Sequence, residues 1–301
     1  MNNQMNIYPY NMEGKEERES SNSEIQALKD FYFNLNGDLW TLNDNWNKGD
    51  PCLNHWIGVF CNKRGNIIGI MFYQNKLHGI INDSISNLIH LEFIHILNPI
   101  FEDKKENSNE IFYVSPKLFI LNSLKEIVIK AVNLRQKIDT LFIFPSSTSS
   151  LEIIDFSHNY LTGELPDFSN LSKLKEINIS NNGLSRSLSK LNTLSSTVIN
   201  IQLQNNYFTG TLPNLNNVNS NLKYLDYRNN TIEGEVPSSY FSDNFFVNLE
   251  YVGLMLTEVN SPEQCKNIPF CIKKLFKNAQ SINDIGFELT NNELQFLLPR
   301  A

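Results

Sequence analysis

Four stretches of sequence repeat one pattern: LEIIDFSHNYLTGELP at residues 151–166, LKEINISNNGLSRSLS at 174–189, VINIQLQNNYFTGTLP at 198–213 and LKYLDYRNNTIEGEVP at 222–237. The asparagine that all four share steps by 23, 24 and 24 residues (182−159, 206−182 and 230−206). Apolar residues two positions apart, such as Ile154 and Phe156, are typical of a short strand with one buried face. In-phase copies of this length predict a stack of coils that share one core.

The shared asparagine has a structural reason. It stands where strand pairing ends, and its amide can both donate and accept hydrogen bonds, so stacked copies can satisfy the backbone of neighbouring turns. A buried backbone group without a partner costs about 1–3 kcal/mol, which favours a polar residue there. We therefore predict a right-handed leucine-rich-repeat solenoid, an α/β repeat fold with a concave parallel β-sheet. Its expected structural ladder is Asn75, Asn159, Asn182, Asn206 and Asn230.

The repeat form N-x-L-x-G-x-L-P resembles the plant-type subclass of leucine-rich repeats. Glycines at 163, 210 and 234 permit a tight bend, and the prolines three residues later favour an extended return path. The copy at Asn182 has Arg186 and Ser187 near the glycine position and no proline. We therefore expect an irregular return path in that coil.

The sequence before the repeats resembles the helical N-terminal cap of plant-type leucine-rich-repeat proteins. Ser23 can cap a helix with Gln26 three residues on, and Ile25, Ala27, Leu28, Phe31 and Tyr32 give that helix an apolar face. Trp40, Trp46, Asp50, Pro51, Cys52, Trp56 and Cys61 follow in the order of the cap motif. The resemblance implies a Cys52–Cys61 disulfide, and closing so short a loop stabilises by about 2.5 kcal/mol.

The domain organisation follows from these motifs. We predict a disordered polar tail at 1–22, the cap at 23–66, the solenoid at 67–257 and a short C-terminal cap and tail at 258–301. Within the solenoid, 151–237 is regular and 67–150 partly degenerate. One degenerate coil has Asn98 a residue early, another has Val132 in place of the asparagine, and the charged stretch 102–110 between them is predicted to be a surface loop. Cys265 and Cys271 resemble the Cys-containing C-terminal cap of the family.

Composition excludes several classes of function. The net charge of −7 and the pI of about 5.3 argue against nucleic-acid or anionic-membrane binding. No apolar run reaches the roughly 18 residues that a membrane span needs. No apolar segment of the secretory-signal kind stands at the start. The missing signal favours a cytoplasmic location, whereas the Cys-bearing caps favour a secreted or cell-surface one, so the localisation stays open.

The candidate binding surface is the concave face, because solenoids bind partners there. Stacking should align the outward strand positions in columns, and tyrosine and arginine are favoured interface anchors, so Tyr224, Arg228 and Tyr251 form the preferred hot spot. The alternative is a merely solvated strand face. The predicted concave-face set is Asp155, Glu176, Asn178, Asn200, Gln202, Tyr224, Asp226, Arg228 and Tyr251.

Catalytic and metal chemistry have little support in the sequence. Asp155, Ser157 and His158 have the residue types of a catalytic triad, but their spacing on one strand opposes the relay geometry. The four cysteines fall in two pairs at opposite ends of the solenoid without zinc-site spacing, which favours disulfides over metal ligands. We expect no catalytic residue, no metal and no cofactor.

Two functional hypotheses follow. Plant-type relatives include receptor ectodomains and secreted inhibitors of cell-wall-degrading enzymes, so the resemblance implies a non-catalytic recognition module. Its concave face would bind a protein, peptide or glycan partner, without nucleic acid and without a membrane span in this chain. The alternative is an intracellular leucine-rich-repeat scaffold with reduced cysteines and no extracellular ligand.

Overall fold

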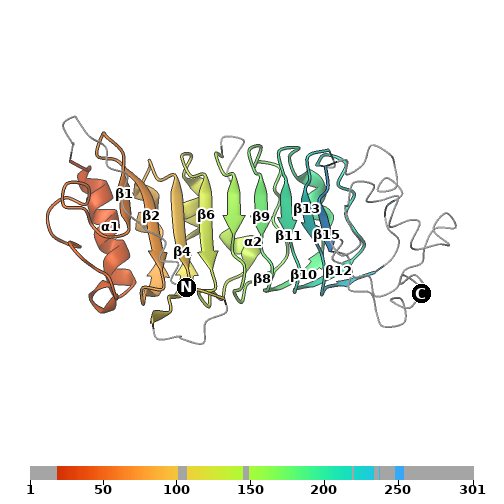
Figure 1. The fold of residues 1–301 in the computed structure, drawn as a ribbon, viewed down its shortest axis with the longest axis horizontal. Helices are drawn as coiled ribbons and strands as arrows, with labels where there is room; N and C mark the ends of the chain where they lie inside the picture. The colour runs from red at the N-terminus through yellow and green to blue at the C-terminus, as the bar shows by residue number, and fades with distance from the viewer. Residues whose placement is uncertain are drawn as a thin grey trace, which may run out of the picture.

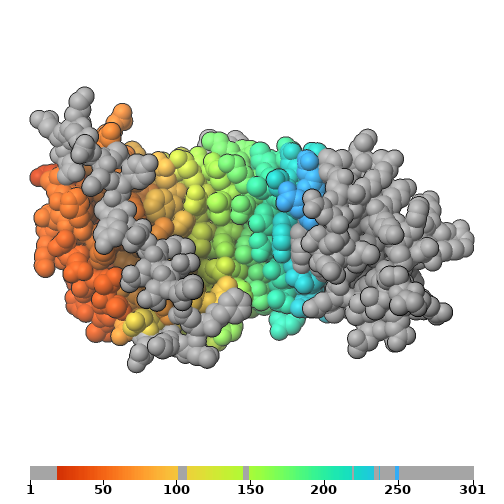
Figure 2. All heavy atoms as spheres, in the orientation of Figure 1, coloured from red at the N-terminus to blue at the C-terminus, as the bar shows by residue number. Residues whose placement is uncertain are grey.

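The computed structural model describes residues 19–100, 107–144, 149–218, 220–233, 237 and 248–253, with the backbone alone for 251–253. The chain forms a solenoid in which successive coils follow one another along the long axis (Figures 1 and 2). The predicted leucine-rich-repeat solenoid is confirmed.

A nine-stranded sheet runs the length of the solenoid and has one strand from each coil. Its first two strands pair antiparallel and all later neighbours pair in parallel. Parallel strands need long crossovers, and here the rest of each coil is the crossover. In order, the strands are β1 (Val59–Cys61), β2 (Ile67–Tyr73), β4 (Phe93–Leu97), β6 (Glu126–Lys130), β7 (Ile153–Asp155), β9 (Glu176–Asn178), β11 (Asn200–Gln202), β13 (Tyr224–Asp226) and β15 (Tyr251–Gly253).

Shorter strands pair along the side of the solenoid. β3 (His78–Ile81) pairs with β5 (Glu110–Val114), and a separate four-stranded sheet has the order β14 (Thr231–Ile232), β12 (Tyr207–Gly210), β10 (Gly183–Ser187) and β8 (Thr162–Gly163). The return paths contain the 3₁₀ helices η2 (Asp83–Asn87), η4 (Pro116–Ile120) and η5 (Ser189–Thr193), and the short helix α2 (Ile138–Leu141).

The apolar residues that define the repeat fill one continuous core. The leucine, isoleucine and phenylalanine positions of each coil, for example Leu151, Ile154, Phe156 and Leu161, are almost completely buried. The two degenerate coils pack in the same way, because Ile94 and Ile96 in β4 and Ile127 and Ile129 in β6 are fully buried. Apolar spacing therefore identified the core even where the asparagine was displaced or missing.

The N-terminal end of the core is covered by the cap. Helix α1 (Asn22–Asn34) buries Ala27, Leu28, Phe31 and Tyr32, as its apolar face predicted, and η1 (Gly37–Leu39) follows it. All three tryptophans of the chain pack into this cap. The ring centroids of Trp40 and Trp46 are 5.1 Å apart, and those of Trp46 and Trp56 are 5.0 Å apart. Cys52 and Cys61 form a disulfide across the adjoining loop.

The start of the cap differs from our prediction. The N-cap is Ser21 rather than Ser23, and Glu24 rather than Gln26 completes the capping box. Ser20 is buried, and its N–H donates to an Asp50 carboxylate oxygen at 2.7 Å. The Glu24 carboxylate also accepts from Ile67 N–H at 3.2 Å, which ties the helix to β2. These tertiary bonds select the earlier serine, so at least residues 19–22 belong to the cap and not to a tail.

The buried asparagines join each coil to the one before it. The Asn206 Oδ1 accepts from Leu184 N–H at 3.0 Å, and its Nδ2 donates to Ile179 O at 3.0 Å and Leu203 O at 3.1 Å. Asn159, Asn182 and Asn230 make the same kind of bonds. Asn75 does so toward the cap, where its side chain exchanges two bonds with the backbone of Leu42.

The missing rung of the ladder comes from a residue that we had assigned to a loop. Asn109 is fully buried, and its Oδ1 accepts from Asn75 N–H at 3.0 Å and Leu77 N–H at 3.1 Å. The prediction of a surface loop through 110 was therefore wrong at its end, because Asn109 takes the ladder position and Glu110 begins β5. Asn98 braces Asn109 through bonds to its backbone N–H and C=O at 2.8 and 2.9 Å.

The coil at Asn182 is also more regular than we predicted. Its return path contains β10, which pairs with β8 on one side and with β12 on the other. Arg186 takes the glycine position with φ of +73°, close to the +81° of Gly210. A left-handed backbone costs a non-glycine residue about 1–2 kcal/mol, and the pairing of Arg186 with Phe208 of β12 holds it in place. Its regularity comes from the neighbouring coils and not from its own sequence.

Several predictions lie outside the described residues: the tail at 1–18, most of the charged stretch 102–110, Gly234, Val236 and everything after 253, including Cys265 and Cys271. In the part that the structure describes, no helix is long and apolar enough to cross a membrane.

The ladder makes a testable prediction. Replacing Asn206 with alanine leaves Leu184 N–H and two backbone carbonyls without their partner, so we expect the free energy of unfolding to fall by about 3 kcal/mol. The matched control is Asn205→Gly, one residue away, whose φ of +59° suits glycine and whose exposed amide should cost under about 1 kcal/mol. Urea unfolding followed by circular dichroism measures both, and equal losses would contradict the ladder's role.

The cap disulfide makes a second prediction. Cys52→Ser with Cys61→Ser should lower the unfolding free energy of the cap by about 2.5 kcal/mol, because the open chain gains loop entropy. Tryptophan fluorescence during urea unfolding reports on the cap selectively, since all three tryptophans lie there. A reductant should produce the same shift in the wild type and none in the double variant. A wild type that is indifferent to reductant would contradict the stabilising role.

Candidate functional site: the concave face of the sheet

The sheet register aligns the outward side chains in columns. One column runs Glu176, Asn200, Tyr224, Tyr251, and a second runs Asp155, Asn178, Gln202, Asp226, Gly253. Both follow because the parallel strands pair without a shift, and neighbouring strands are about 4.8 Å apart. The structure therefore brings the predicted concave-face residues together on one side of the sheet, although the Asp226 side chain is fully buried there. The side chain of Tyr251 lies outside the described part.

The same columns continue toward the cap, where apolar residues alternate with Glu126 and His95. The first extends through Ile153, Glu126 and Phe93, and the second through Val128, His95 and Met71. Phe93 is the centre of an aromatic cluster, with ring centroids 5.3 Å from Phe60 and 5.2 Å from His95. Gly69 makes room for this ring, because a Cβ at Gly69 would stand about 2.0 Å from Phe93.

Our sequence interpretation missed this N-terminal half, because it took the concave positions from the regular repeats alone. The signal was present in the outward positions of the degenerate strands, where Phe93, Leu97 and Val128 are apolar although their neighbours in the strand fill the core. The concave face thus has two parts, an N-terminal half in which apolar and aromatic side chains stand among Glu126, His95 and Lys130, and a polar C-terminal half.

Arg228 is engaged within the chain. Its Nε lies 3.0 Å from Asp226 Oδ1 and its second guanidinium nitrogen 2.8 Å from Oδ2, a two-point pairing with a fully buried carboxylate. A planar guanidinium fork held this way is fixed in orientation. The pair therefore gives the C-terminal half of the face a rigid polar feature beside Tyr224.

Two further pairs, each of one basic and one acidic side chain, face each other across neighbouring strands. Lys130 Nζ stands 3.6 Å from Asp155, while Glu126 approaches His95 Nε2 to 3.0 Å without the geometry of a hydrogen bond. Glu176, in the middle of the face, takes part in no ion pair with the described residues. It is therefore a carboxylate that a ligand could reach.

The side chains of Asp155, Ser157 and His158 do not form a relay. The carboxylate of Asp155 accepts from the backbone N–H of Ser157 at 2.8 Å, the buried Ser157 hydroxyl has no hydrogen-bond partner among the described residues, and His158 Nε2 faces Asn181 Nδ2 at 3.2 Å. Among the described residues no group of three or more histidine, cysteine, aspartate or glutamate side chains could hold a metal ion.

A second asparagine row lies beside the buried ladder. Asn229 Nδ2 donates to Asn205 Oδ1 at 2.6 Å, Asn205 Nδ2 to Asn181 Oδ1 at 2.8 Å, and Asn181 Nδ2 approaches His158 Nε2. We call His158, Asn181, Asn205 and Asn229 the outer amide row. All four have φ between +54° and +59°, a left-handed conformation that asparagine tolerates well. The Asn-Asn doublets at 181–182, 205–206 and 229–230 are the signal of this row in the sequence.

His158 at the edge of the sheet and His95 on its face both have a lowered pKa, which favours the neutral imidazole. Burial lowers the pKa of His158, and nearby Lys130 lowers it further against the opposing effect of Asp155. An Asn181 amide nitrogen can only donate, so His158 Nε2 must accept and the ring proton sits on Nδ1. Burial likewise lowers the pKa of His95 despite Glu126.

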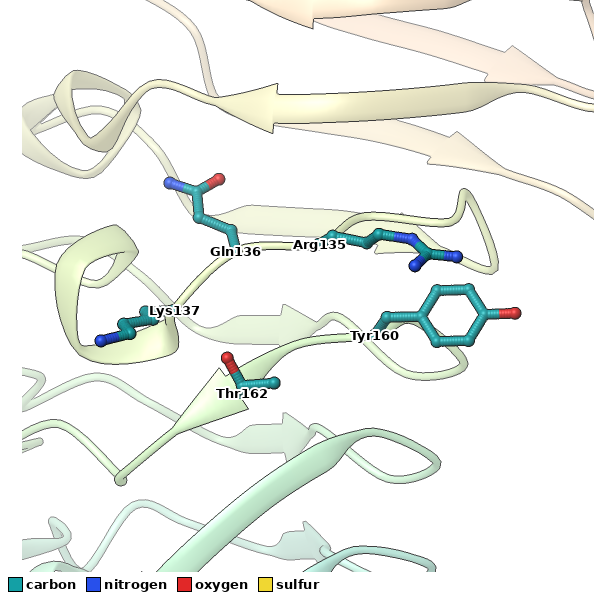
Figure 3. Close-up of a pocket in the computed structure, with 5 residues that line it drawn as sticks. All are labelled: Arg135, Gln136, Lys137, Tyr160 and Thr162. Carbon is teal, nitrogen blue, oxygen red and sulfur yellow. The ribbon is translucent and has the colours of Figure 1, made fainter.

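A hollow of about 400 Å³ opens on the side of the solenoid, lined by Arg135, Gln136, Lys137, Tyr160 and Thr162 (Figure 3). It lies where the coil around Val132 contributes no strand to the side sheets. Gln136 bridges the break, because its side-chain amide exchanges two 3.1 Å bonds with the backbone of Val114. Arg135 and Lys137 point in opposite directions (Figure 3), so their charges do not converge on one ligand group.

Comparisons with known proteins agree with the fold. Residues 150–171 match the family described as Leucine Rich Repeat. A probable leucine-rich repeat receptor-like protein kinase of Arabidopsis thaliana is 30% identical over 73 residues, which are 24% of this chain and 7% of that protein. The chain therefore spans a small part of that relative's length.

Solved structures show the same architecture. The crystal structure of PEPR1–AtPEP1 matches 80% of this chain and 36% of its own with a TM-score of 0.57 at 20% identity. The leucine-rich-repeat ectodomain of the Arabidopsis thaliana receptor kinase GASSHO1/SCHENGEN3, in complex with CASPARIAN STRIP INTEGRITY FACTOR 2, matches 80% of this chain and 30% of its own with a TM-score of 0.57 at 19% identity. At these identities the likeness shows the fold, and the chain spans about a third of either structure.

The lowered histidine pKa values predict a pH dependence. The unfolded chain binds protons near the ordinary histidine pKa of about 6.5, whereas folded His95 and His158 do so only at lower pH. The free energy of unfolding should therefore be highest above pH 6.5 and fall as the pH drops from there to the folded pKa values. Chemical denaturation at a series of pH values measures this slope.

The control variant is His158→Asn, which can continue the outer amide row and tolerates the left-handed backbone. Its stability should depend less steeply on pH in this window than that of the wild type. An unchanged slope would show that His158 does not resist protonation in the folded state.

Proposed function

We propose that this leucine-rich-repeat protein, whose residues 150–171 match that family and whose coils take that fold, is a non-catalytic recognition module that binds an extended peptide segment of a protein partner across its concave face. The observation that carries the proposal is the pair of in-register columns, which place apolar and aromatic residues at the N-terminal end of the face and polar residues at the C-terminal end.

The N-terminal half would hold an apolar side chain of the partner. Phe93, seated over Gly69 between Phe60 and His95, offers a ring that is fixed by its neighbours before any ligand arrives. Large aromatic residues that lose little entropy on binding are the usual anchors of protein interfaces. A partner segment with a leucine, methionine or aromatic residue fits this half.

The middle and C-terminal parts of the concave face would select a basic residue of the partner, next to its apolar residue. Glu176 stands in the first column without an ion pair among the described residues, whereas Asp155 and Asp226 already face Lys130 and Arg228. The chain carries a net charge of −7, which favours the approach of a positively charged segment. Asn178, Asn200 and Gln202 stand on the same or the neighbouring strand as Glu176, and Tyr224 stands one strand further, so groups that can bond a peptide backbone continue along the face. Arg228 would contribute mainly by its two-point pairing with Asp226, which holds both side chains in a fixed orientation.

The fold neighbours support a binding role. PEPR1 is solved with AtPEP1, and the GASSHO1/SCHENGEN3 ectodomain with CASPARIAN STRIP INTEGRITY FACTOR 2. The closed Cys52–Cys61 bond supports an extracellular module over an intracellular scaffold with reduced cysteines, because disulfides persist in oxidising compartments.

Selection from a random peptide library tests the proposal. Peptides chosen on the wild-type chain should contain an apolar and a basic residue, and Glu176→Arg should weaken their binding at least tenfold, because it places like charge at the proposed subsite. Phe93→Ala should weaken it similarly.

The matched control is Glu164→Arg, the same charge reversal at an exposed carboxylate on the side of the solenoid, where only a 3.6 Å contact to Arg186 is lost. Binding should be unchanged in this variant. Peptides that bind all three variants as tightly as the wild type would move the site off the concave face.

A further inference from the structure

We propose that the outer amide row, together with Tyr160 and Tyr207, forms a second binding surface for an extended, uncharged, β-1,4-linked glycan chain. This surface lies at the edge where the concave strands end, and the proposal does not depend on a peptide bound to the concave face.

The tyrosines lie at the same edge as the amides. Each directly follows a buried ladder asparagine, and each side chain is well exposed, 53% for Tyr160 and 66% for Tyr207. Tyr160 stands two residues after His158, and Tyr207 stands two residues after Asn205, so each ring follows a member of the row on its own coil.

The surface therefore repeats every second coil. Tyr160 with His158 forms one unit, Tyr207 with Asn205 forms the next, and Gly183 leaves the intermediate coil without a side chain between the two rings. Neighbouring coils are about 4.8 Å apart, so the units repeat at about 10 Å. A sugar ring in an extended β-1,4 chain is about as long as one coil spacing, and successive rings turn over, so every second ring presents the same face.

The chemistry of the row suits hydroxyl groups. Asn205 and Asn229 each use one amide N–H in the row, and no hydrogen bond of the described residues uses the other. Each amide oxygen has a second lone pair, so the row offers donors and acceptors side by side, and hydroxyls can satisfy both. Neither the amides nor the tyrosines are charged, and burial keeps His158 neutral near pH 7 by lowering its pKa.

The row is also rigid before any ligand arrives. The side chains are bonded head to tail at 2.6 and 2.8 Å, and the Arg135 guanidinium lies 4.5 Å from the centroid of the Tyr160 ring (Figure 3), which fixes that ring. A surface that is ordered in advance loses little entropy on binding.

The repeat distance favours a glycan over a polypeptide. An extended peptide advances about 3.3 Å per residue, so groups on one side recur at about 6.6 Å and lose register with amides about 4.8 Å apart. A chain whose unit length is close to the coil spacing keeps its register across several coils. We therefore assign the row to a polysaccharide strand that lies along the solenoid axis.

Isothermal titration of the full chain with cellohexaose tests the assignment. Wild type should bind, and Tyr160→Ala with Tyr207→Ala should weaken binding at least tenfold without changing the unfolding midpoint. Tyr113→Ala, which removes an exposed tyrosine of β5 away from the row, is the matched control and should bind as the wild type does. Asn205→Gly with Asn229→Gly should also weaken binding.

Three outcomes would overturn the proposal: no binding of cellohexaose by the wild type, equal binding by the double tyrosine variant, or equal affinity for the α-linked maltohexaose, which lacks the two-ring repeat. Binding of an uncharged serine-rich peptide in place of cellohexaose would assign the row to polypeptides. Glu176→Arg should leave cellohexaose binding unchanged, so failure here and failure of the concave-face proposal are distinguishable.

Discussion

The hydrogen bonds of the buried asparagine side chains hold successive coils together, and the rest of the structure depends on them. Each amide accepts from a backbone N–H of the preceding coil and donates to carbonyls of both coils, as Asn206 does with Leu184, Ile179 and Leu203. These backbone groups turn inward, away from water, where an unmade bond costs about 1–3 kcal/mol. The ladder therefore sets the stacking distance and direction of the coils, and the apolar core fills the space that this spacing leaves.

The coils around Asn98 and Val132 show what happens when the ladder is interrupted. Asn109 supplies the missing amide from beyond the inserted segment, and Asn98 bonds to the backbone of both Asn109 and Ala131. The main sheet continues through this region without a shift. On the side, however, the strands break, Gln136 joins the two parts, and a hollow forms beside Tyr160. The main sheet thus tolerates an insertion that the side sheet does not.

The sequence predicted most of the fold because the repeat has local causes. Apolar residues two positions apart, such as Ile177 and Ile179, identify strands regardless of tertiary context, and a 24-residue period identifies the stack. Asn109 could not be placed, because the inserted residues break the period and separate it from its strand. Ser21 and Ser23 both precede a helix with a polar residue three positions later, and only the bonds of Ser20 and Glu24 to Asp50 and Ile67 decide between them.

The candidate sites were less predictable for a related reason. The periodicity of the sequence predicts which side chains point outward, so the columns could be derived. It does not predict which of these side chains contact one another. The pairing of Arg228 with Asp226 and the seating of Phe93 over Gly69 depend on side-chain packing between positions that the period treats alike. The Asn-Asn doublets were readable, since one asparagine suits the left-handed turn and the next suits the buried rung.

Adjacent asparagines with opposite environments explain how one repeat can carry two surfaces. The buried member fixes the coil, which leaves the strand positions before it free to vary on the concave face and the turn positions around it free to vary at the edge. Because each position recurs at the same spacing, a single substitution per coil builds a whole row, as Asn181, Asn205 and Asn229 illustrate. The concave columns vary in chemistry from coil to coil, which suits a ligand whose side chains differ. The edge row is uniform over three coils, and uniform rows match ligands that are themselves repetitive.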